Sequence, residues 1–216
     1  MNRDIIFYSY LTSEQKKILD GSIQRFTFRK GQVVHRHGDA CVGVIFVHQG
    51  RLAFTALSEE GREITLFRAE SGQTCVLSAS CVFQGVESES IVTAETKTEL
   101  SILPAAVLAQ LMQENPDVER LVYRNAAQQY ASALGTLQRI VFFSLEKRLA
   151  FFLKEECSRR KSPVFSATHE QIARYIGSSR EVVTRTLNQF ASRGIVSLGR
   201  GTVTVLDQDA LEDILA

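Results

Sequence analysis

The sequence contains no apolar stretch that approaches the roughly 20 residues a membrane-spanning helix needs. It has no CxxC pair either, because Cys41, Cys75, Cys81 and Cys157 are widely spaced, and this excludes a zinc ribbon and a thioredoxin-type motif. The start of the chain, "MNRDIIFYSYLTSEQKK", lacks both a long apolar run and a small-residue cleavage site. We therefore expect no secretory signal and no membrane partner, and a cytoplasmic protein with free thiols.

Catalytic motifs and an excess of charge are also missing. We find no Gly-rich phosphate loop, no metal-binding triad and no nucleophile with its partners, which argues against an enzyme. The formal net charge is only +1, but nucleic-acid binding depends on a local patch rather than on the total. Such a patch is present, because basic residues gather around positions 176–196 while the acidic residues of this region lie in the tail.

The first half of the chain has the pattern of a β domain. Short apolar runs such as "VGVIFVHQG", "RLAFTAL", "EITLF" and "TELSIL" are separated by glycines between positions 26 and 103. This spacing predicts an all-β barrel or sandwich, with a hairpin turn at Gly61 in "SEEGRE".

After Pro104 the pattern becomes helical, and "ENPDVE" places Pro116 in the first turn of a long helix that reaches about Ile140. Apolar and amide residues recur on this helix at a spacing nearer to helix pairing than to burial in a large core. We favour a dimerisation helix over an ordinary packed helix, with an interface formed by Val118, Val122, Asn125, Gln129, Ala133 and Leu137.

The last quarter of the chain predicts two short helices and a β-hairpin. Thr168 and Gln171 form a capping box for the first helix, Gly177 ends it, and either Ser178 or Ser179 caps the second. "GIVSL" and "TVTVL" then flank "GRG", a tight turn with Arg200 at its tip. Helix, turn, helix and hairpin together predict a winged helix-turn-helix.

The second of these helices carries a polar face that suits base recognition. On a helical wheel, Arg180, Glu181, Thr184, Arg185 and Asn188 fall within about 140°, opposite an apolar stripe. Arginine can donate twice to guanine and glutamate can accept from cytosine, so we expect Arg180, Glu181, Thr184 and Arg185 to contact bases. Contacts to the DNA backbone are expected from Thr168, His169, Ser178, Ser179 and Arg200.

The whole chain resembles the family of the cyclic-AMP receptor protein and FNR (CRP/FNR), which are bacterial transcription regulators. "KGQVVHRHGD", "FVHQGRL" and "SEEGREITLF" resemble its cyclic-nucleotide-binding β-roll, and "NPDVERLVYRN" resembles the start of its dimer helix. "THEQIARYIGSSREVVTRTLNQFASRGIV" is the most specific match, because Arg180, Glu181 and Arg185 fit the R-E-x-x-x-R pattern with which the family reads a TGTGA-like half-site.

The resemblance implies an α+β protein with a sensory β-roll domain over 1–115, a dimerisation helix over 116–140 and a winged helix-turn-helix domain over 141–216. It also implies a homodimer that binds a palindrome in double-stranded DNA and recruits or blocks RNA polymerase.

The sensor departs from the nucleotide-binding members of that family. Leu77 stands near the position of their ribose-binding glutamate, and Ser88 or Glu89 stands near that of their phosphate-binding arginine. Ala133 and Leu134 replace the threonine and serine with which the dimer helix touches the nucleotide. A carboxylate at the phosphate position would repel the ligand, so these differences argue against cyclic AMP.

An iron–sulfur sensor fits poorly, because no cysteine precedes Cys41. Cys75 and Cys81 lie where a ligand would sit, and they are either small core residues or a site for thiol redox, metal or haem. His35 and His37 share a strand face, and they are either surface residues or a site for metal or haem. The candidate effector pocket comprises Cys75, Leu77, Ser78, Cys81, Ser88 and Glu89, and its ligand is an unknown small molecule or a redox signal.

Three functions follow from these patterns. The first is a dimeric DNA-binding regulator controlled by an effector other than cyclic AMP. The second is a regulator with a degenerate sensor that binds DNA constitutively. The third is a ligand-binding β-roll that serves a partner other than DNA.

Overall fold

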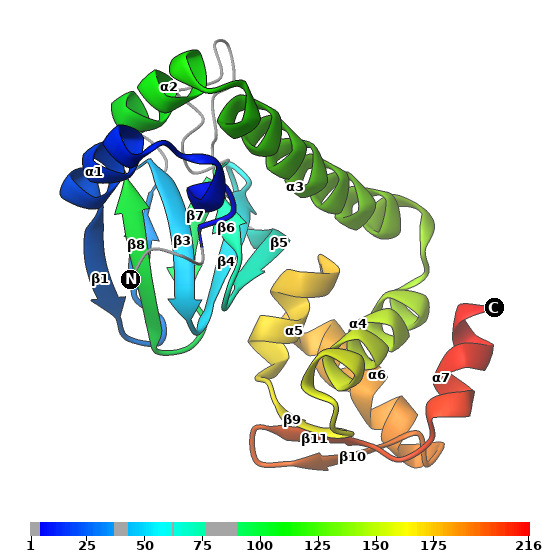
Figure 1. Cartoon of the computed structure of the whole chain (residues 1–216). Coiled ribbons are helices and arrows are strands. Elements are labelled where there is room, and N and C mark those ends of the chain that lie inside the picture. The colour runs from blue at the N-terminus through cyan, green and yellow to red at the C-terminus, as the bar shows by residue number, and fades with distance from the viewer. Residues whose placement is uncertain (1–4, 37–42, 62, 77–89) are drawn as a thin grey trace. The chain divides into compact units, whose positions relative to one another are not determined.

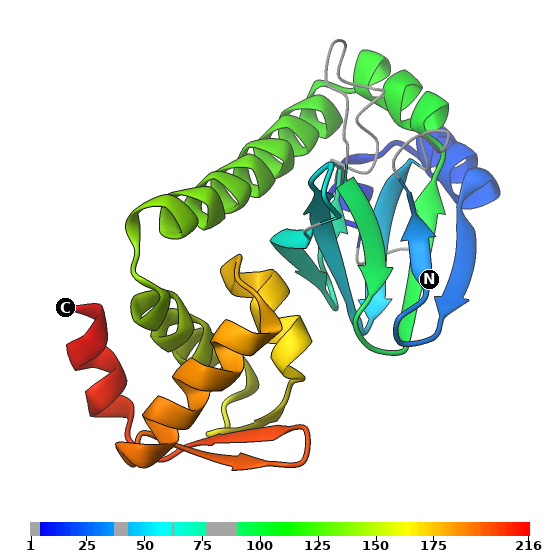
Figure 2. The ribbon, with the colours of Figure 1, turned by 180° about the vertical axis from the view of Figure 1, so that it is seen from behind.

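A computed structural model of the chain describes residues 5–36, 43–61, 63–76 and 90–216. Its backbone divides into two compact units, one formed by residues 1–61 and 66–134 and the other by residues 62–65 and 135–216. Within the part that the structure describes, none of the helices combines the length and apolar character needed to cross a bilayer. Figures 1 and 2 show the course of the chain through each unit.

The first unit is built on two antiparallel sheets of four strands each. Their strand orders are β1-β8-β3-β6 and β2-β7-β4-β5. The strands are β1 (Gln24–Phe28), β2 (Val33–His35), β3 (Val44–Gln49), β4 (Arg51–Leu57), β5 (Glu63–Glu70), β6 (Thr74–Cys75), β7 (Ser90–Ala94) and β8 (Thr98–Leu103). The expected β domain is therefore confirmed, and Gly61 lies in the β4–β5 turn with a φ of 79°.

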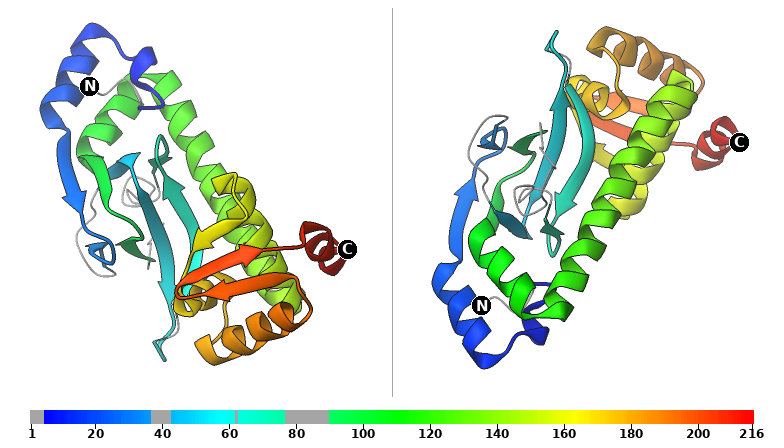
Figure 3. Two further views of the ribbon diagram at one scale, coloured as in Figure 1. Left: turned by 90° about the horizontal axis from the view of Figure 1, so that it is seen from below. Right: turned by 90° about the horizontal axis from the view of Figure 1, so that it is seen from above.

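Two apolar clusters hold this unit together. Alternate residues of the strands face inward, so Ile45, Leu52, Phe54, Cys75 and Leu100 fill the space between the sheets. The intervening residues Val44 and Phe46 of β3 belong to a second cluster with helices α1 (Ser13–Ser22), α2 (Ala105–Glu114) and the start of α3 (Pro116–Phe142). The helix α3 thus begins as part of the β-roll core, and Figure 3 shows it as one unbroken helix.

The second unit contains a helix-turn-helix flanked by a small sheet. Its elements are α4 (Leu145–Arg160), β9 (Val164–Ser166), α5 (His169–Ile176), α6 (Arg180–Ser192), β10 (Val196–Gly199), β11 (Thr202–Val205) and α7 (Gln208–Leu215). The hairpin β10–β11 is the expected wing, and β9 adds a third antiparallel strand to it. Leu149, Phe152, Leu187 and Phe190 are fully buried at the centre of its core. The fold class expected from the sequence is confirmed.

Candidate functional site

The turn between α5 and α6 fixes how the second helix leaves the first. Thr168 and Gln171 form a capping box at the start of α5, with hydrogen bonds of 3.0 and 3.1 Å. Gly177 ends α5 in the left-handed region, with a φ of 63°. A Cβ at Gly177 would also lie 2.9 Å from Cδ1 of Ile140, so both conformation and space favour glycine here.

Ser179 caps α6, which settles the choice that the sequence left open. Its side chain accepts a hydrogen bond of 3.3 Å from the backbone N–H of Val182. Ser178 instead belongs to the end of α5, where its N–H donates to the carbonyl of Ala173 at 3.0 Å. Arg180 and Glu181 are therefore the first two residues of α6, and their side chains start at its N-terminus.

The polar face of α6 is exposed along the side opposite the core. Val183, Leu187 and Phe190 are fully buried, whereas Arg180, Glu181 and Arg185 are exposed and Thr184 is half-buried. Glu181, Thr184, Arg185 and Asn188 line one shallow depression on this face. The structure thus brings the four expected base-contacting residues together at the N-terminal half of one helix.

The carboxylate of Glu181 is held in its charged form. Its pKa is lowered first by a hydrogen bond from its own backbone N–H, then by the Ser179 side chain and by the positive charge of Arg180. The charged carboxylate has acceptor oxygens only, so it can pair with an N–H donor but not with a base acceptor. This chemistry fits the exocyclic amine of cytosine.

The expected backbone-contacting residues lie at the start of α5, in the α5–α6 turn and in the β10–β11 turn. Thr168, Ser179 and Arg200 are exposed, and Arg200 occupies the turn between β10 and β11. His169 and Ser178 are half-buried, and Nδ1 of His169 lies 2.8 Å from Oγ1 of Thr184. The sequence did not reveal this contact between α5 and α6.

Arg148 is a structural residue of this site that the sequence reasoning missed. From α4, its Nη1 donates to the carbonyls of Ile176 at 2.7 Å and Gly177 at 3.2 Å. Burial lowers the pKa of its guanidinium. Because both carbonyls belong to the end of α5 and the turn, Arg148 ties the turn to the supporting helix α4.

Arg148→Met is expected to destabilise the helix-turn-helix by about 1.5–3 kcal/mol, the value typical of hydrogen bonds made by a charged group. Hydrogen exchange of the α5 and α6 amides in the whole chain would measure this as faster opening. Lys154→Met is the matched control, because Lys154 is also on α4 but makes an exposed ion pair with Glu212 that contributes little. Equal protection in the two variants would contradict the role given to Arg148.

The first unit contains a cavity of about 270 Å³ between the β5–β6 turn and α3. Its lining is largely polar and includes Gly72, Gln73, Thr74, Asn125, Gln128, Gln129 and Ser132. Thr74 is only 3% exposed, and its hydroxyl has no hydrogen-bond partner among the residues that the structure describes. A buried hydroxyl without a partner is costly, so a polar molecule bound here would relieve that cost.

Cys75 is the one expected effector-pocket residue that the structure describes. It is fully buried, and its Sγ lies 3.4 Å from Oε1 of Gln129 on α3. Gln129 also donates to the Thr74 carbonyl at 2.8 Å and to Oδ1 of Asn125 at 2.7 Å. These contacts join β6 directly to α3. Leu77, Ser78, Cys81, Ser88 and Glu89 lie outside the described residues.

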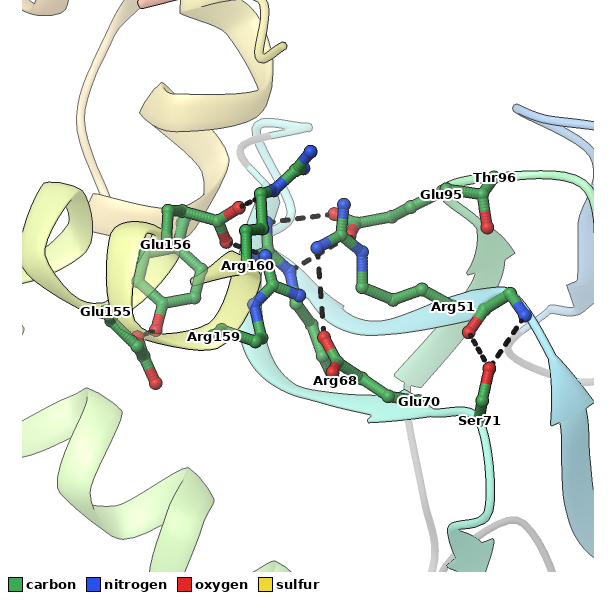
Figure 4. A network of polar contacts seen from close by, with 12 residues as sticks. Arg51, Arg68, Glu70, Ser71, Glu95, Thr96, Glu155, Glu156, Arg159 and Arg160 are labelled. Atoms are coloured by element: carbon green, nitrogen blue, oxygen red, sulfur yellow. Dashed lines mark hydrogen bonds and ion pairs between the residues drawn. The ribbon is translucent and has the colours of Figure 1, made fainter. Parts of the chain in front are cut away.

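A charged cluster reinforces the strands beside this cavity. One carboxylate, that of Glu95, binds Nε of Arg51 at 2.6 Å and Nε of Arg68 at 3.0 Å, and Arg51 also approaches Glu70 at 3.8 Å (Figure 4). The Arg51, Arg68 and Glu95 side chains are each less than 15% exposed. Although Arg68 lines the cavity, its charge is therefore balanced by Glu95.

His35 is on β2, and its buried Nδ1 has no hydrogen-bond partner among the described residues. His37 lies outside those residues. No group of three or more histidine, cysteine or acidic side chains suited to a metal occurs within the described ranges.

The residues expected at a dimer interface are divided between different surroundings. Val118 and Val122 are fully buried against the β-roll of their own chain. Asn125 and Gln129 are half-buried and hydrogen-bonded to each other. Ala133 is half-buried and Leu137 is 44% exposed, so of this set Leu137 offers the most surface to a partner.

A different face of α3 carries an exposed apolar stripe, which we call the α3 seam. At 100° per residue its members fall within about 60° of one another, roughly 120° from the buried face. Their exposed fractions run from 42% to 69%, and they are Tyr123, Tyr130, Leu134, Leu137 and Val141. Such spacing is typical of helices that pair.

Two family models match the chain in succession. Residues 25–115 match the cyclic nucleotide-binding domain, and residues 147–214 match the Crp-like helix-turn-helix domain. The β-roll and the helix-turn-helix described above occupy these ranges.

Individual proteins are similar over nearly the whole chain. A solved structure from Eubacterium rectale, assigned to the crp/fnr family of transcriptional regulators, is 35% identical with a TM-score of 0.91 and 98% coverage of both chains. The cyclic AMP receptor protein of Thermus thermophilus is 28% identical over 204 residues, or 94% of each chain. The c-di-GMP responsive global regulator CLP of Xanthomonas campestris shares the fold, at 21% identity and a TM-score of 0.78 over 91% of this chain and 100% of that one.

Proposed function

Because this chain belongs to the CRP/FNR family of transcription regulators, we propose that it binds a TGTGA-like palindrome as a homodimer and responds to an effector other than cyclic AMP. The family consists of DNA-binding regulators rather than enzymes. One observation carries the specific proposal: Arg180, Glu181 and Arg185 are exposed together at the capped N-terminal half of α6. In a helix-turn-helix, this part of the second helix is the part that reaches the base edges.

Each side chain has a role that follows from its chemistry. Arg180 and Arg185 donate to O6 and N7 of guanines, and the charged Glu181 accepts from N4 of a cytosine. Thr184 lines the same depression as Glu181 and Arg185 and completes the base-contacting set. Thr168, His169, Ser178, Ser179 and Arg200 contact the phosphates, which positions the helix without specifying sequence.

Titration of a labelled TGTGA-palindrome duplex at fixed salt tests the proposal. We expect specific binding to exceed binding to a shuffled duplex by at least about 10³-fold, the lower end of the usual specificity range. Equal affinity for the two duplexes would contradict it and would favour the alternative of a β-roll that serves a partner other than DNA.

The α3 seam supports the homodimer. Two copies that pair along Tyr130, Leu134 and Leu137 would cover side chains that are exposed in the single chain. A symmetric dimer then presents two α6 helices to half-sites about one helical turn, roughly 34 Å, apart. RNA polymerase is the partner through which a DNA-bound regulator of this family would act.

The polar cavity beside α3 supports effector control. Thr74 offers a hydroxyl that has no partner within the described part of the chain, and Asn125, Gln128 and Gln129 offer amides, so the cavity suits a small polar molecule. The Cys75 thiol also contacts Gln129 on α3, so oxidation at Sγ would alter a contact with the same helix. Haem and metal remain alternatives for a sensor that uses the cysteines.

Anaerobic purification followed by visible spectroscopy, metal analysis and DNA titration separates these effectors. A chromophore, or an affinity that changes with oxidation only while Cys75 is present, would identify a redox or gas sensor. A colourless protein whose affinity ignores oxidation but responds to a small molecule would identify the cavity as the sensor. An affinity that responds to neither would leave the second alternative, a constitutive DNA-binding regulator.

A further inference from the structure

The hydroxyl of Thr184 is engaged in two hydrogen bonds inside the helix-turn-helix. Oγ1 donates to the carbonyl oxygen of Arg180 at 2.8 Å and lies 2.8 Å from Nδ1 of His169. A hydroxyl has one hydrogen, and a carbonyl oxygen can only accept. Both contacts are satisfied when Thr184 donates to Arg180 and His169 donates its Nδ1–H to Thr184, which assigns the imidazole tautomer from the network.

This arrangement removes the hydroxyl as a donor to the bases. Its hydrogen is used within α6, so it has none to donate to the N7, O6 or O4 acceptors of the major groove. Thr184 nevertheless lines the depression shared with Glu181, Arg185 and Asn188 and is half-buried rather than buried. The methyl group is the part of this side chain that neither hydrogen bond engages.

We propose that Thr184 reads one thymine of each half-site through that thymine's C5-methyl group, and that His169 is the positioning residue that holds Thr184 in this rotamer. Threonine methyl groups make such apolar contacts with thymine in the major groove. The inference rests on the proposed DNA binding and deepens it. It adds a thymine-specific contact to the guanine and cytosine contacts of Arg180, Glu181 and Arg185.

The position of His169 explains why it belongs to the readout. His169 is the first residue of α5, and its Nδ1 contacts Thr184 on α6. It therefore joins the two helices on the side that is proposed to face the DNA. The contact holds Thr184 in one rotamer before DNA binds. The side chain therefore loses less conformational entropy on binding. Loss of the contact is expected to weaken discrimination at the thymine more than the overall attraction to DNA.

Deoxyuridine substitution tests the proposal atom by atom, because deoxyuridine pairs like thymidine but lacks the C5-methyl group. Each thymine of the half-site, on either strand, is replaced in turn in both halves of the palindrome. At one position, deoxyuridine is expected to lower the affinity of the whole wild-type chain by about fourfold per half-site. This is the contribution of roughly one buried methyl group. The other positions are expected to change little.

Three variants assign the effect to Thr184 and His169. Thr184→Ser keeps the hydroxyl but lacks the methyl and is expected to bind the thymine and uracil duplexes equally. Thr184→Val keeps a methyl and the shape of the side chain and is expected to keep the preference. His169→Ala is expected to reduce the preference, whereas His169→Asn, which retains a donor near the Nδ1 position, is expected to restore it.

The outcomes separate this inference from the function on which it rests. Failure of the wild-type chain to prefer the palindrome over a shuffled duplex would overturn the proposed function itself. Specific binding with no sensitivity to deoxyuridine at any position would overturn only the thymine contact. An unchanged preference in Thr184→Ser would show that another side chain reads the methyl group and would equally overturn the inference.

Discussion

Arg185→Ala is expected to weaken binding to a TGTGA palindrome by about 2–6 kcal/mol. A dimer loses one arginine–guanine pair in each half-site, and each pair contributes roughly 1–3 kcal/mol of discrimination. Arg185 is exposed on the depression of α6, whose opposite face is fully buried, so its truncation removes the contact without disturbing the core. Fluorescence anisotropy at constant salt, with specific and shuffled duplexes, measures both affinity and specificity.

Arg200→Ala provides the matched control for this prediction. Arg200 carries the same charge but lies at the tip of the wing, where it is expected to contact phosphate. Its loss should weaken both duplexes alike and reduce the salt dependence by about one phosphate contact per chain. If Arg185→Ala behaved like Arg200→Ala, with unchanged specificity, the base-contacting role would be refuted.

Leu137→Glu is expected to raise the dissociation constant of the dimer by about two to four orders of magnitude. Two copies of this leucine meet at the proposed interface, and burial of each contributes roughly 1.5–3 kcal/mol. Each substituted copy would also place a like charge against its partner. Analytical ultracentrifugation over a concentration series measures the change, and DNA binding is expected to fall with it because half-sites would bind singly.

Arg124→Glu is the control for the interface. It introduces the same acidic side chain on α3, but about 140° away from Leu137 and on an exposed surface. This variant should remain dimeric. A dimer that survives Leu137→Glu and dissociates with Arg124→Glu would place the interface on the other side of the helix.

The architecture was accessible from the sequence because its signals are local. Short apolar runs between turn glycines predicted the strands, and the Thr168–Gln171 capping box together with Gly177 predicted α5 and its end. The short strand β9 and the last helix α7 were not predicted. β9 has only three residues, too few to show a periodic pattern in the sequence. It is held by pairing with β11 rather than by its own composition.

The two faces of α3 show what periodicity alone does not determine. The expected interface pattern began with Val118 and Val122, which are covered by the β-roll of the same chain. A helical stripe reports that a face is buried, but its spacing is the same whether the cover is a partner or the chain itself. The exposed α3 seam became visible only once the cover of the first face was known.

Contacts between distant parts of the chain were also inaccessible. Arg148 and Gly177 are 29 residues apart, and His169 and Thr184 are 15 apart. Neither pair follows a helical or strand repeat that would have linked them. Residue type indicated the base-contacting set of α6, but the partners that hold it in place come from tertiary packing.

The position of Gln129 has a thermodynamic consequence. Its amide binds β6 from one side of α3, while Tyr130, the next residue, belongs to the seam on another side. Because both side chains are attached to one helix, a molecule that moves the α3 backbone through Gln129 would turn or shift the seam as well. Linkage then requires reciprocity: if the effector tightens pairing by some factor, pairing tightens effector binding by the same factor. The measured affinity for the effector should therefore depend on protein concentration.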